Sequence, residues 1–182
     1  ADLAVWQSIG HMVSGCGSHA NQNCVVDGYF VLDGNIACTG TMTTDAVVVN
    51  GSYYATVFNG VFDGRGYNID GYASGEWHSF LYRLGDNAVL RNISFTNVDR
   101  TKMSAPILTQ DNWANSNIVI ENIYIHYSNF VANGKGLLVG GVARNNITYR
   151  NILVEADQTS GDTKESVVST TSVNEGLVKN VY

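Results

Sequence analysis

Apolar and polar residues alternate along several stretches of the chain, and each stretch is interrupted near its centre by an asparagine. In the clearest case Ile118 and Ile120 precede Asn122, while Ile123 and Ile125 follow it. Alternation with a period of two, rich in β-branched residues, predicts strands with one buried face. Because the alternation breaks at the asparagine, we interpret this residue as a one-residue corner that turns the chain from one sheet into the next. The same pattern is formed by Ala88, Leu90, Ile93 and Phe95, and by Ile147, Tyr149, Ile152 and Val154.

The corner asparagine recurs at a nearly constant interval. Four segments share the frame of a bulky apolar residue, a charged residue, asparagine and a β-branched residue. Their asparagines are spaced by about 29 residues, and a fixed period of this length is typical of stacked structural repeats. The four segments are LRNI at 90–93, IENI at 120–123, YRNI at 149–152 and VKNV at 178–181.

The first corner can be placed in two ways. The segment IDGY at 69–72 fits the frame with Gly71 in the asparagine position, and glycine shares the tolerance of asparagine for left-handed backbone. Asp63 offers a different register, since it lies one full repeat before Asn92. We favour Gly71 because Ile69 and Tyr72 keep the apolar frame, whereas Asp63 is followed by glycine.

A third apolar run lies upstream of each corner, so each repeat contains three short strands. At about 3.3 Å per residue, roughly 29 residues suit one coil of three strands with turns. Successive coils would lie about 4.8 Å apart with parallel pairing, and corner amides would bond to one another in a buried column. The upstream runs are SFLY from 79, APIL from 105, LLVGGV from 137 and SVVS from 166. The predicted column consists of Gly71, Asn92, Asn122, Asn151 and Asn180.

This arrangement is an all-β parallel β-helix, expected to form a single domain over residues 1–182. We assign 1–40 to an N-terminal cap and first coil, with a short helix over 2–9, and 41–182 to stacked coils. The last corner is followed by two residues only, so we expect an open C-terminal end that a longer chain or a second copy would cover. The absence of an initiator Met suggests a processed or excised chain.

Composition and charge limit the classes of partner that the chain is expected to bind. A formal net charge of −6 with ten Lys and Arg argues against nucleic acid as a partner. The sequence contains no run of about 20 apolar residues, so we expect no membrane span. Cys16 and Cys24 bracket a polar loop and could form a disulfide in an extracellular protein, with Cys38 as the unpaired cysteine, although three pairings are possible. Three buried thiols are the alternative, while the spacings do not suit a zinc site.

A family resemblance is carried by FNGVFDGRGYNIDGY at 58–72, FLYRLG at 80–85 and NAVLRNISF at 87–95. Together they resemble the GLUG-type repeats of bacterial surface and secreted proteins. GKGLLVGG at 134–141 is similar to the glycine-rich strand of those repeats, and GYFVLDGNIACTG at 28–40 to their opening coil, with Asn35 in place of the usual aspartate. The resemblance covers about residues 26–182 and implies a right-handed, pectate-lyase-like β-helix outside the cell.

No catalytic constellation stands out. Polysaccharide-active β-helix enzymes need clustered carboxylates, and neither the acids nor the four histidines recur at a common offset. We therefore expect no catalytic residue, metal or cofactor. A basic column flanked by tryptophans could bind an anionic glycan, although solvated turn residues are the more ordinary explanation. Its members are Trp77, His78, Lys102, Trp113, Lys135 and Lys164.

The sequence thus favours a non-catalytic extracellular scaffold, adhesin or fibre module on the cell surface, with a glycan or another surface ligand as its partner. A polysaccharide lyase or glycoside hydrolase is the first alternative. A filament subunit that associates head-to-tail is the second.

Overall fold

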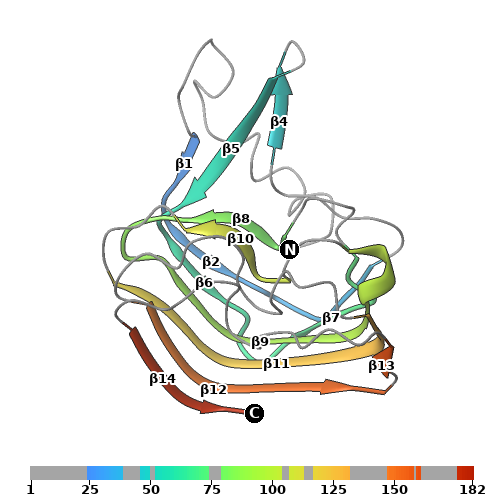
Figure 1. Ribbon diagram of the computed structural model, residues 1–182. Helices are drawn as coiled ribbons and strands as arrows, with labels where there is room; N and C mark the ends of the chain where they lie inside the picture. The colour runs from blue at the N-terminus through green and yellow to red at the C-terminus, as the bar shows by residue number, and fades with distance from the viewer. Residues whose placement is uncertain are drawn as a thin grey trace.

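The computed structural model describes residues 24–38, 46–49, 52–73, 79–103, 107–112, 117–131, 147–157, 159–160 and 176–182. These residues form an all-β structure in which nearly all strands pair in parallel (Figure 1). The strands are β1 (Cys24–Val26), β2 (Tyr29–Val31), β3 (Ile36–Ala37), β4 (Ala46–Val49), β5 (Ser52–Phe58), β6 (Val61–Asp63), β7 (Asn68–Asp70), β8 (Leu81–Leu84), β9 (Val89–Asp99), β10 (Thr109–Asn112), β11 (Ile118–Val131), β12 (Ile147–Ala156), β13 (Thr159–Ser160) and β14 (Gly176–Val181); η2 (Arg100–Lys102) is a 3-10 turn.

The larger sheet stacks strands that are one repeat apart in sequence. Its order is β14-β12-β11-β9-β6-β2, with β3 and β7 continuing beside β9 and β13 beside β11. Ile118 on β11 lies opposite Ile147 on β12, and Ile147 lies opposite Gly176 on β14, so the offset between these strands equals the predicted period. Figure 1 shows β9, β11 and β12 as parallel ribbons that bend together.

The early strands keep the parallel pairing but not the exact period. Asn68 on β7 lies opposite Ser94 on β9, which is a shorter step along the chain than the repeat. Ile36 on β3 lies opposite Ile69 on β7, which is a longer step. The turns between the strands therefore absorb differences in coil length, while the strands stay aligned.

The smaller sheet has the order β1-β5-β8-β10 and is also parallel. Its strands begin later than the apolar runs predicted, since β8 starts at Leu81 and β10 at Thr109. The coil-to-coil pairing nevertheless begins within those runs, because Phe80 and Leu81 donate N–H bonds to the carbonyls of Ile107 and Leu108. The runs at 137 and 166, like the predicted helix at 2–9, lie outside the described residues.

An antiparallel hairpin breaks the parallel pattern. β4 pairs with β5 in the register Val49 to Ser52, and only Asn50 and Gly51 separate the two strands. In Figure 1 this hairpin extends away from the curved strands. An Asn-Gly pair between alternating apolar segments is a strong hairpin motif, and here it adds an element that the repeat pattern does not predict.

Buried side chains follow the alternation that the sequence predicted. Leu90, Ile93 and Phe95 on β9 lie opposite Ile120, Ile123 and Ile125 on β11, and all six are at most 2% exposed. Aromatic rings fill the space between the sheets, with Phe80 in edge-to-face contact with Phe62, Tyr72 and Phe95 at centroid separations of 5.3, 5.9 and 5.0 Å. Such packing contributes beyond simple area burial and fixes the sheets relative to each other.

The strands turn at left-handed asparagines that lie five residues apart. Asn87, Asn92 and Asn97 all have positive φ, of 63°, 55° and 53°. Asn117 and Asn122 repeat the first two corners on the next strand, with φ of 56° and 54°. At Asn97 the pairing with β11 is irregular, since Phe95 pairs with Ile125 but Val98 with Tyr127. The third corner is therefore absent from β11.

Candidate functional site

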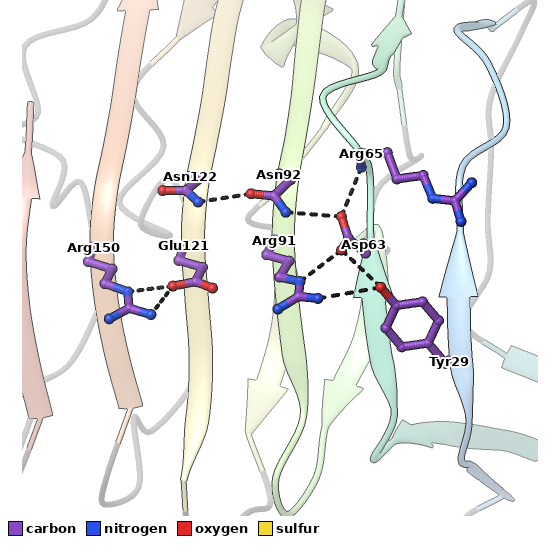
Figure 2. Close-up of polar contacts among 8 residues, drawn as sticks. All are labelled: Tyr29, Asp63, Arg65, Arg91, Asn92, Glu121, Asn122 and Arg150. Atoms are coloured by element: carbon purple, nitrogen blue, oxygen red, sulfur yellow. Dashed lines mark hydrogen bonds and ion pairs between the residues drawn. The ribbon is translucent and has the colours of Figure 1, made fainter.

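Four corner asparagines form a ladder on the outside of the larger sheet. Asn92, Asn122, Asn151 and Asn180 have φ between 52° and 55°. The Nδ2 of Asn122 donates to the Oδ1 of Asn92 at 2.8 Å, and the two following pairs repeat this bond at 3.0 Å. Each of these strands thus donates one side-chain hydrogen bond to the strand before it, in addition to its backbone ladder. Figure 2 shows the bond from Asn122 to Asn92.

Gly71 does not belong to this column, so the preferred register for the first corner was wrong. Asp70 pairs with Thr96, and the Gly71 N–H donates to the Thr96 carbonyl at 2.8 Å. Gly71, with φ of 68°, therefore lies at the corner of Asn97. Its left-handed backbone fits the prediction, but its partner is one corner further along.

The position before Asn92 in the ladder is filled by the Asp63 side chain, whose Oδ1 accepts from Asn92 Nδ2 at 3.0 Å. The corner after Asp63 is two residues longer than that of the next coil, because Asp63 pairs with Arg91 but Asn68 pairs with Ser94. The extra length places Arg65 and Gly66 in a turn with positive φ.

Gly64 explains why an Asp-Gly sequence is compatible with this register. The backbone at Gly64 passes so close to the next coil that a Cβ there would overlap the carbonyl oxygen of Asn92. A side chain at position 64 is therefore excluded. In the sequence, Gly64 was the reason to reject Asp63 as the first member of the ladder. In the structure, Gly64 lets the backbone pass close to Asn92, which brings Asp63 into the ladder.

The ladder is more exposed than expected. Asn122, Asn151 and Asn180 are exposed and Asn92 is half-buried, so the prediction of a buried column was wrong. A left-handed residue shifts the alternation by one, so that two successive side chains face outward at the corner. Glu121 and Asn122 are those outward residues, between the buried Ile120 and Ile123.

Asp63 is the centre of a polar cluster at the end of the ladder, shown in Figure 2. Its Oδ2 accepts from Tyr29 Oη at 3.0 Å and from Arg91 Nε at 2.9 Å. Its Oδ1 accepts from the Arg65 N–H at 2.9 Å and from Asn92. Burial alone would raise the pKa of this carboxyl, but the four hydrogen bonds, led by that from Asn92, outweigh burial and lower the pKa to about 2.

A second ion pair continues the charged row beside the ladder. Arg91 lies opposite Glu121 in the strand register, and Glu121 accepts from the guanidinium of Arg150 on the following coil. Opposite charges on neighbouring strands stabilise a sheet pair modestly when exposed. These charged side chains therefore have partners within the stack.

A shallow groove of about 750 Å³ runs along the ladder across four coils. The ladder amides line it, with Ser94 and Tyr124 beside them. The hydroxyl of Tyr124 donates to Glu155 on the next coil at 2.8 Å, which fixes the ring and raises the pKa of the phenol. The full lining is Asp63, Arg65, Gly66, Asn92, Ile93, Ser94, Asn122, Ile123, Tyr124 and Asn151.

The predicted basic column cannot be placed against this groove. Trp77, His78, Trp113, Lys135 and Lys164 lie outside the described residues, and for Lys102 only the backbone, in η2, is described. The column stays a prediction.

The predicted disulfide is also untested, since Cys16 lies outside the described residues and Cys24 is described only as backbone in β1. Cys38 carries a free thiol. Burial, together with the nearby Asp70, raises the pKa of this thiol to about 11. Cys38 is therefore a weakly reactive thiol at neutral pH.

Within the described ranges no group of three or more His, Cys, Asp or Glu side chains could hold a metal ion. In the same residues no helix is long and apolar enough to span a membrane. No known family, curated protein or solved structure matches this chain.

Two substitutions at Asn122 distinguish the energetic contribution of the left-handed backbone from that of the amide ladder. Asn122→Gly keeps the left-handed conformation but removes two exposed amide bonds, and should cost about 1 kcal/mol. Asn122→Val also forces a β-branched residue into that conformation and should cost about 1–2 kcal/mol more. Urea unfolding measures both values.

Asn129→Val is the matched control, since Asn129 is exposed on the same strand with extended backbone. It should change stability by less than about 0.5 kcal/mol. Equal losses for the Gly and Val variants at position 122 would contradict a left-handed corner.

The Asp63 cluster predicts an acid-dependent loss of stability. Because the folded pKa of about 2 lies below the ordinary 3.8, the carboxylate stabilises the fold above pH 4 and that contribution disappears as pH falls toward 2. The shift corresponds to about 2 kcal/mol. Unfolding free energies of the wild type and Asp63→Asn, measured from pH 7 to pH 2, should converge by this amount. Parallel curves would show that Asp63 carries no such stabilisation.

Proposed function

We propose that this chain is a right-handed parallel β-helix of the GLUG-like type, serving as a non-catalytic scaffold or adhesin module on the cell surface. The parallel pairing of strands one repeat apart supports the coil, since each strand bonds to its counterparts before and after it. A right-handed path agrees with the general preference of parallel crossovers. The extracellular location rests on the resemblance of residues 26–182 to repeats of surface proteins.

The observation that carries the non-catalytic function is the saturation of the Asp63 carboxylate. Four donors occupy its two oxygens, which is the full capacity of a carboxylate. An acid with a pKa near 2 is ionised at neutral pH, so it has no proton to donate and is a weak base. Glu121 is likewise bonded to Arg150. These carboxylates join one coil to the next, which is a structural task.

Deletion of one repeat tests the coil. Removing residues 119–147 joins Ile118 to Thr148, and because Ile118 and Ile147 occupy the same register, the strands should still align. We expect a folded protein that unfolds cooperatively, with a denaturant m value lower by roughly a sixth because that share of the chain is gone.

Deletion of residues 119–132 is the control, since it removes about half a repeat and disrupts the register. It should not fold. Failure of the whole-repeat deletion to fold, or equal behaviour of both variants, would overturn the proposed coil.

Polysaccharide turnover tests the absence of catalysis. The purified chain, incubated with neutral and uronate-containing polysaccharides, should generate neither reducing ends nor the ultraviolet absorbance of unsaturated uronates. Cleavage that disappears in Asp63→Asn would contradict the scaffold and establish an enzyme centred on that carboxylate.

A further inference from the structure

The amide ladder leaves half of its hydrogen-bonding capacity unused. Each side-chain amide has two N–H donors and an oxygen with two lone pairs, and the ladder uses one of each at Asn122. Asn122 and Asn151 are exposed along the groove. Each ladder asparagine along the groove therefore offers a donor and an acceptor, repeated at the strand spacing of about 4.8 Å, whereas the fully bonded Asp63 offers neither.

The spacing of the amides can be compared with the rise per residue of extended polymers that could bind along the groove. An extended polypeptide advances about 3.3 Å per residue, which does not match one amide per coil. The rise per residue of an extended pyranose chain is close to the strand spacing, and sugar hydroxyls both donate and accept hydrogen bonds. A linear glycan laid along the groove could thus repeat the same contact from coil to coil.

One aromatic residue also lines the groove. Tyr124 lines the groove together with the ladder amides and is half-buried, with its hydroxyl bonded to Glu155. A ring held in one orientation presents its face at little entropic cost. Aromatic faces pack against the C–H faces of pyranose rings.

The charged residues around the groove indicate whether a neutral or an anionic glycan would bind there. Asp63 lines the groove, while its partner Arg91 does not, and the carboxylate of Glu155 accepts from the Tyr124 hydroxyl. Arg65 lines the groove as well and is exposed, but in Figure 2 its side chain extends away from the amide ladder. With a net charge of −6 in addition, an uncharged chain is favoured over a polyanion.

We propose that the groove along Asn92, Asn122 and Asn151 binds an uncharged linear pyranose glycan, with Tyr124 stacking on one of its rings. This site rests on the proposed scaffold function and gives it a ligand class. It is distinct from the predicted column of Lys and Trp residues, which would bind an anionic glycan. Four coils line the groove, so the bound segment is about three to four sugar residues long.

The experiment is calorimetric titration of the intact 182-residue chain with cello-, xylo-, manno- and laminari-oligosaccharides of increasing length, and with oligogalacturonates and heparin fragments as polyanions. We expect one neutral series to bind, with affinity rising up to three or four sugars and then constant. Tyr124→Ala should weaken binding at least about tenfold, whereas Tyr124→Phe retains the ring and should weaken it less than about threefold. His126→Ala, on the same strand but outside the groove, is the matched control and should leave affinity unchanged.

Side-chain amide NMR signals give a readout that does not depend on the aromatic residue. The resonances of Asn122 and Asn151 should shift on titration with the binding oligosaccharide, while those of Asn129 should not. Binding of polyanions alone, no binding of any neutral series, or a Tyr124→Ala variant with wild-type affinity would each overturn the glycan site. A folded repeat-deletion variant without polysaccharide cleavage would in that case leave the scaffold function standing.

Discussion

The structure depends on one backbone constraint, which is that the corners at Asn92, Asn122, Asn151 and Asn180 are single left-handed residues in register with one another. If a corner shifted by one residue, every side chain beyond it would change face, and the buried isoleucines of β9 and β11 would point to solvent. Asparagine suits this constraint for two reasons. It tolerates the left-handed conformation, and its amide bonds to the identical residue one coil away.

The ladder has a direction, because every amide donates toward the N-terminal coils. Aligned amides polarise one another, so the row presents its positive end to its first acceptor. That acceptor is the carboxylate of Asp63, and a negative charge at this end is stabilised in the way an anion is stabilised at a helix N-terminus. The ladder polarity is therefore one cause of the low pKa of Asp63, in addition to its hydrogen bonds from Tyr29, Arg65 and Arg91. On the strand before Asp63 no ladder asparagine is present, and the hydroxyl of Tyr29 donates to the Asp63 carboxylate.

Sequence alone could predict β9, β11, β12 and β14, their parallel pairing and the four asparagine corners, because all of these follow from the period and the alternation, but it did not predict the antiparallel hairpin of β4 and β5. It could not place the first corner, since Asp63 reaches the ladder only through a turn lengthened by Arg65 and Gly66, and no periodic pattern encodes that reach. The exposure of Asn122 was misjudged because the left-handed residue itself reverses the alternation that was used to infer burial. The corners at Asn87 and Asn97 could have been found from their five-residue spacing, but that spacing does not repeat across all coils. The polar partners of Asp63 come from different coils, so their meeting required coordinates.

The close approach at Gly60 limits how the coils can vary in length. A Cβ at this position would overlap the carbonyl oxygen of Gly28 on the preceding coil, so the backbones there admit no side chain. Contacts of this kind hold neighbouring coils together between β5 and β6, while the step from coil to coil still differs between β3 and β9. Differences in length are therefore accommodated between the aligned strands and in the lengthened turn after Asp63, while the asparagine corners keep their register. Such a chain can therefore change in length by whole repeats while the register of the asparagine corners is retained.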